Sequence, residues 1–197
     1  MADRYYTLIS GLPNLEKKSL PNQQQLLEFI SSELHDDDYR LAELLVMHSF
    51  PDGLQHSILE LETSQTLIKE AISCSQSELL QEWIKWRSKL RQFQLFAKTT
   101  SISSGELSHA NNDLFIALEE VFDGSTLDAL LREIHPAEAV RLEKQMFLKW
   151  LNEKAFSDVF SLDAVYNYIL RYTFLWEENT PNPDWKSKLL QAEIPKI

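Results

Sequence analysis

The scarcity of glycine constrains the fold of this chain more than any other feature of the sequence. Glycine occupies four of the 197 positions, and the four lie far apart, at Gly11, Gly53, Gly105 and Gly124. Proteins rich in β-sheet use glycine in tight turns, and phosphate-binding loops need several glycines close together. This spacing excludes the two common glycine-rich nucleotide-binding motifs. The sequence therefore predicts an all-α fold.

The composition is otherwise that of a folded globular protein. Hydrophobic residues make up 44% of the chain and charged residues 25%, so a sizeable core is expected. The formal net charge of -11 disfavours general binding to nucleic acid or to anionic membranes. We find no apolar run long enough to span a membrane, and the single cysteine, Cys74, has no partner for an internal disulfide. We expect a cytoplasmic protein.

The segment 75–98 predicts one long central helix with an apolar face. At its start, Ser75 and Glu78 have the spacing of a capping box. Its large apolar residues then recur every three or four positions, which an α-helix gathers onto one face. The predicted core residues of this helix are Leu79, Trp83, Trp86, Leu90 and Phe93.

Four basic residues flank the apolar face of this helix. At about 100° per residue, Lys85 and Lys89 fall on one side of the face, and Arg87 and Arg91 fall on the other. Two interpretations are open. The four side chains pair with the chain's own acidic surface, which we favour, or they bind an acidic helical partner whose approach is steered by charge. The second interpretation makes them candidate protein-docking residues.

Local signals predict seven or eight helices in an irregular bundle around the long helix. The N-terminal residues 5–9 are aromatic and β-branched, which is typical of a short strand or a packed extended arm. Residues 55–73 fit a helix better than a strand. Further helix starts are expected at the capping box of Asn22 and Gln25, at Asp36–Asp38, near Leu114, at the cap signal of Ser125 and Asp128, at Pro136, after Ser161 and after Pro181.

A serine- and asparagine-rich stretch divides the predicted helices into two groups. Residues 99–113 are expected to form a linker or mobile loop. An N-terminal half, 1–98, holds the long helix, and a C-terminal half, 114–197, follows the linker. We expect the two halves to form one integrated domain.

Residue patterns for catalysis or metal binding are lacking. The five histidines do not have the spacings of zinc sites, and Asp36–Asp38 is not followed by further ligands at loop spacing. Adjacent acidic pairs such as Glu119 and Glu120 point about 100° apart on a helix. The five tryptophans fit core packing better than a cofactor site. We therefore predict no enzymatic activity, no catalytic residues, no cofactor and no metal.

Three groups of short motifs resemble an uncharacterised family of bacterial proteins encoded beside V/A-type ATPase genes. The motifs are Tyr5–Leu8 with Gly11–Leu15, Glu82–Trp83 with Leu90–Arg91, and Phe160–Ala164. That family looks like an abbreviated relative of the ATPase's C-type subunit, which corresponds to the d-type subunit in eukaryotes. The C-type subunit is a helical funnel that couples the central stalk to the membrane rotor ring.

The resemblance implies a non-catalytic subunit or accessory factor of a bacterial V/A-type ATPase. Its partners would be the central-stalk and rotor-ring subunits, and its role would be in proton or sodium transport coupled to ATP. Such a protein would be cytoplasmic and peripheral to the inner membrane through the complex, without a span of its own. Only Leu90–Arg91 maps across, as a structural or docking pair. The alternative is a freestanding helical adaptor or scaffold, and a small helical enzyme is the less favoured third hypothesis.

Overall fold

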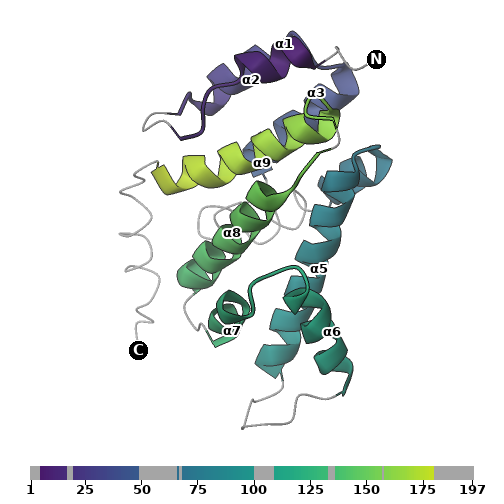
Figure 1. The fold of residues 1–197 in the computed structure, drawn as a ribbon, viewed down its shortest axis with the longest axis vertical. Helices are drawn as coiled ribbons and strands as arrows, with labels where there is room; N and C mark the ends of the chain where they lie inside the picture. Colours follow the sequence, from purple (N-terminus) through teal and green to yellow (C-terminus); the bar gives the residue numbers. More distant parts are fainter. Residues whose placement is uncertain are drawn as a thin grey trace, which may run out of the picture. The chain divides into compact units, whose positions relative to one another are not determined.

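The all-α class predicted from the sequence is confirmed. A computed structural model describes residues 5–16, 20–48, 66, 68–99, 109–132, 136–156 and 158–179, and in these ranges the regular structure is helical throughout. Residues 68–74 are helical. The other helices of the described part are α1 (Tyr6–Gly11), α2 (Gln23–Ser31), α3 (Asp36–His48), α5 (Glu78–Thr99), α6 (His109–Glu119), α7 (Gly124–Arg132), α8 (Pro136–Glu153) and α9 (Leu162–Asn179) (Figure 1).

The described residues form two compact units that are nested along the chain. Residues up to 78 and residues from 156 onward belong to one unit, which we call the outer unit. Residues 79–155 belong to the other, which we call the inserted unit. This division differs from the sequential halves expected at 1–98 and 114–197, because residues near the two ends of the chain share one core.

The outer unit is held together by packing of α9 and α2 against α3. Burial is complete for Leu26 and Ile30 of α2, Leu45 of α3 and Ile169 of α9. Burying an aliphatic side chain of this kind contributes about 1.5 to 3 kcal/mol to folding, before the cost of ordering the chain. The core of the outer unit is therefore built from helices that are far apart in sequence.

The N-terminal segment is a helix, so the expected strand or extended arm is wrong. The aromatic and β-branched residues 5–9 lie largely in α1, where Leu8 is fully buried. Gly11 ends α1 so close to the ring of Phe29 that a Cβ atom there would lie 2.7 Å from the ring. The Tyr6 ring also lies 4.8 Å from the ring of Phe160. Tertiary packing has overridden the β propensity of this segment.

Several helix starts follow the predicted caps. Asn22 and Gln25 form the predicted capping box of α2, with each side chain bound to the other residue's backbone N–H. The acidic triplet Asp36–Asp38 forms the first turn of α3, where its negative charge interacts favourably with the positive end of the helix dipole. Ser161 accepts a hydrogen bond from the Ala164 backbone at the start of α9. These starts are local features, which is why the sequence predicts them.

Two caps and one linker boundary differ from the prediction. Helix α7 is capped by Asp123, which lies before the predicted Ser125. Helix α5 begins at Glu78, because the Ser75 hydroxyl accepts from the Ser77 backbone and forms a turn instead of a cap. Helix α6 begins at His109, inside the expected linker 99–113. Residues 49–65, 100–108 and 180–197, with the expected last helix, lie outside the described residues.

Candidate protein-docking site on helix α5

The apolar face of α5 lies in the core of the inserted unit. The structure buries all five predicted core residues, with Trp83 and Leu90 fully inaccessible. Phe93 packs against Phe115 of α6 with ring centroids 5.5 Å apart. Trp86 meets Phe122 edge-on at 6.3 Å. Helix α5 is therefore the helix around which the inserted unit packs its aromatic side chains.

Arg87 is a buried structural residue, so it is not accessible as a docking residue. Its side chain is 8% exposed, and its Nε lies 3.6 Å from Oε1 of Glu143 on α8. Burial lowers the pKa of Arg87 to about 10, although the nearby Glu143 carboxylate opposes that shift. The guanidinium also lies 5.3 Å from the centre of the Trp83 ring. The predicted internal pairing of these charges holds for Arg87.

Arg91 lies one turn after Arg87 on the same edge of α5. Its side chain is half-buried, and its positive charge lowers the pKa of Arg87 further. The edge formed by the two arginines is therefore buried at Arg87 and half-buried at Arg91. This edge offers a partner less accessible charge than the edge formed by the lysines.

Lys85 and Lys89 form the accessible basic edge of α5. Lys85 is exposed and Lys89 is half-buried. Their Nζ atoms lie 5.3 and 4.6 Å from the centre of the Trp86 ring, within the range of a cation–π interaction. The Trp86 indole donates to Glu82 at 3.3 Å. We call Lys85, Lys89 and the Trp86 ring beneath them the lysine edge.

Lys154 lies next to the lysine edge, where the Glu82 carboxylate offsets its charge. The sequence did not predict this contact. Lys154 follows α8 and donates to Glu82 of α5 at 2.5 Å. Its Nζ also lies 4.6 Å from the centre of the Trp150 ring. The pair bridges two helices of the inserted unit, and the sequence carries no local signal that would join Lys154 to Glu82. Both side chains remain partly exposed.

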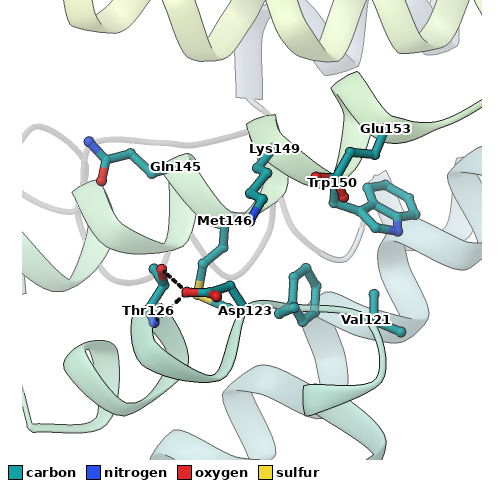
Figure 2. Close-up of a pocket in the computed structure, with 9 residues that line it drawn as sticks. Val121, Asp123, Thr126, Gln145, Met146, Lys149, Trp150 and Glu153 are labelled. Atoms are coloured by element: carbon teal, nitrogen blue, oxygen red, sulfur yellow. Dashed lines mark hydrogen bonds between the residues drawn. The ribbon is translucent and has the colours of Figure 1, made fainter.

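A small hollow opens beside the start of α7 (Figure 2). Its volume is about 170 Å³. Apolar and polar side chains from the α6–α7 connection, α7 and α8 line it: Val121, Phe122, Asp123, Thr126, Gln145, Met146, Lys149, Trp150 and Glu153. The sequence did not predict this hollow, because the residues come from separate helices and carry no common motif.

At the hollow, the Asp123 carboxylate has a pKa well below its usual value. Its Oδ2 accepts from the Ser125 hydroxyl, from the Thr126 hydroxyl and from the Thr126 backbone, and Figure 2 shows the bonds to Thr126. These bonds, aided by the charge of Lys149, lower the pKa of Asp123 to about 2. The carboxylate is therefore ionised at neutral pH, and it caps the N-terminus of α7.

The described part of the chain shows no group of three or more His, Cys, Asp or Glu side chains that could hold a metal ion. In the same residues, no helix combines the length and the apolar character needed to cross a membrane. Comparison of the chain with protein-family models, with curated proteins and with solved structures finds no match. The role of the α5 surface is therefore inferred from its own contacts, and the ATPase resemblance stays a prediction.

Proposed function

We propose that this chain is a non-catalytic, protein-binding helical subunit or accessory factor that docks an acidic partner segment on the lysine edge of α5. The observation that carries the proposal is the placement of Lys85 and Lys89 over the Trp86 ring. The two amines form a positive site on a chain of net charge -11. Such a site would attract a carboxylate-bearing partner and repel positively charged surfaces.

The geometry of the lysine edge supports docking by a helix or an extended segment. The two lysines are one turn apart on α5, so they present their charges in a line along the helix. The Trp86 ring restricts the motion of both amines, which reduces the side-chain entropy lost when a partner binds.

We propose further that the partner belongs to a bacterial V/A-type ATPase. The support is the resemblance of Tyr5–Leu8, Glu82–Trp83 and Phe160–Ala164 to the family encoded beside those ATPase genes. In this proposal the chain acts like the ATPase's C-type subunit, between the central stalk and the membrane rotor ring. It would take part in ion transport by coupling or assembly, without catalysing a reaction itself.

Charge reversal tests the docking role. The double variant Lys85→Glu with Lys89→Glu should lose most of its ability to capture partner subunits from native membranes, and the residual capture should depend little on salt. Arg132→Glu is the matched control, because that side chain is 84% exposed on the same unit. Far-ultraviolet circular dichroism should show both variants folded. Undiminished capture by the double variant would remove the docking role from this edge.

Co-purification tests the identity of the partner separately. The tagged chain, isolated from cells that hold an intact V/A-type ATPase, should bring stalk or rotor subunits with it. If the chain migrates alone, the ATPase assignment is wrong. If it brings an unrelated protein whose capture depends on Lys85 and Lys89, the freestanding adaptor is the correct alternative.

A further inference from the structure

Glu82 is an acidic side chain on the same face of α5 as the lysine edge. It lies four positions before Trp86 and seven before Lys89, and a helix returns to the same face at both steps. The Trp86 indole donates to Oε1 of Glu82 at 3.3 Å, and the amines of Lys85 and Lys89 lie over the same ring. One indole therefore contacts both the carboxylate and the two amines.

The second oxygen of Glu82 binds a third lysine. Its Oε2 accepts from Nζ of Lys154 at 2.5 Å. The same Nζ lies 4.6 Å from the centre of the Trp150 ring, so this lysine, like the two of the lysine edge, lies over an indole. A third ammonium group is therefore present at the Glu82 end of the lysine edge, and in the free chain an internal carboxylate neutralises it.

The ion pair of Lys154 and Glu82 is accessible enough to exchange its acidic member. The two side chains are 26% and 39% exposed, whereas those of Arg87 and Glu143 are 8% and 10% exposed. Breaking a buried pair is costly, but a pair in contact with water stabilises little, because solvent screens the charges and both side chains lose rotamer freedom. Displacing Glu82 from Lys154 should therefore reduce a partner's affinity by at most about fivefold.

We propose that Glu82 is an internal competitor of the partner: it occupies Lys154 in the free chain, and a carboxylate of the acidic segment replaces it on docking. The inference rests on the proposed function and adds a regulating residue to that site. After the exchange, Lys154, Lys85 and Lys89 bind the segment, while Glu82 stays on the Trp86 indole. A segment with one carboxylate only replaces Glu82, so the site selects segments that carry several.

A synthetic hexaglutamate peptide with blocked ends tests the exchange, and hexaglutamine is its uncharged control. Titrations of the full chain at about 50 mM salt, followed by the Trp86 indole N–H signal in nuclear magnetic resonance, give the affinity. Glu82→Gln keeps an oxygen that can accept from the indole but removes the competing charge. This variant should therefore bind hexaglutamate about fivefold more tightly than the wild-type chain. Unchanged or weaker binding by Glu82→Gln would overturn the proposal.

Two further variants separate competition for Lys154 from the general loss of a negative charge. Glu153→Gln removes an exposed carboxylate next to Lys154 in the sequence and should change the affinity by less than about twofold. In a Lys154→Gln background, Glu82→Gln should tighten binding by at most about twofold, because the lysine for which Glu82 competes is absent. Equal gains from Glu82→Gln in the two backgrounds, or an equal gain from Glu153→Gln, would contradict the proposal.

The competitor role and the docking role fail in different ways. If Lys85→Glu with Lys89→Glu abolishes hexaglutamate binding while Glu82→Gln binds like the wild-type chain, the lysine edge docks acidic segments and the competitor role is wrong. If hexaglutamate binds no better than hexaglutamine to the wild-type chain and to Glu82→Gln, and the double variant captures partners normally, the docking role itself is wrong. If Glu82→Gln also captures more partner from native membranes, the same competition governs the natural partner.

Discussion

At the scale of single residues, the role of each of the four basic residues of α5 depends on the group that its side chain contacts. Arg87 faces Glu143 and is buried, whereas Lys85 is exposed and Lys89 half-buried, with both amines over the Trp86 ring. An unpaired buried charge is far more costly than an unpaired surface charge. A positive charge on one helix therefore stabilises the fold at one position and remains available to a partner at another.

Removing one member of the buried pair should be severely destabilising. Arg87→Met leaves the Glu143 carboxylate buried without its cation, and we expect the free energy of unfolding in urea to fall by about 3 kcal/mol. Combining it with Glu143→Leu should recover most of that loss, because both charges are then removed. Arg132→Met, at an exposed position, should change stability by less than about 0.5 kcal/mol. Equal stability of the wild-type chain and Arg87→Met would show that the pair contributes nothing.

Asp123 should make stability depend on pH in the acid range. Its pKa is lowered from 3.8 to about 2, so the folded state favours the ionised carboxylate. The resulting stabilisation is complete above the ordinary pKa and is lost as the pH falls towards the folded-state pKa. In urea titrations between pH 4 and pH 2, Asp123→Asn should remove this part of the pH dependence, because asparagine also caps a helix but carries no charge. If Asp123→Asn keeps the full pH dependence of the wild-type stability, other carboxylates cause that dependence.

At the scale of elements, two tyrosines of α9 hold the connection between α1 and α2 at two points. Tyr168 donates to the Pro13 carbonyl at 2.7 Å, and Tyr172 donates to the Pro21 carbonyl at 2.6 Å. Burial raises the pKa of both phenols, so they remain protonated donors well above neutral pH. The two bonds hold the residues before α2 against α9. Pro13 follows α1 and Pro21 precedes α2, so both acceptor carbonyls lie outside the helices.

Removing either hydroxyl should loosen this connection. Tyr168→Phe and Tyr172→Phe should each lower the free energy of unfolding by about 1 kcal/mol, since each leaves a carbonyl without its donor. Tyr6→Phe is the control, because Tyr6 is 54% exposed. Thermal or urea unfolding followed by circular dichroism measures the difference. A loss in the control as large as in the two variants would mean that the two hydrogen bonds are not responsible for it.

At the scale of the whole molecule, prediction from sequence succeeded where the determining contacts are local. The capping box of Asn22 and Gln25 and the apolar periodicity of α5 involve residues within a few turns, and both are found in the structure. The helical state of α1 and the burial of Arg87 depend on residues distant in sequence, such as Glu143. The nested division into two units has the same origin, since α9 completes a core begun by α3.

The candidate site shows the same limit. The sequence predicted basic residues at the edges of α5, and the lysine edge is made of two of them. The hollow was not predictable, because its lining residues become neighbours only when α8 packs against α7. Periodicity places side chains on faces of one helix, but it does not say which faces meet.

The central claim is that the lysine edge of α5 binds an acidic protein segment. The most direct measurement is the affinity of the captured partner for the wild-type chain and for Lys85→Glu with Lys89→Glu, at salt concentrations from about 50 to about 300 mM. We expect wild-type binding to weaken steeply with salt, and variant binding to be at least about tenfold weaker at low salt and nearly independent of salt. Equal affinities and equal salt dependence for the two proteins would contradict the claim.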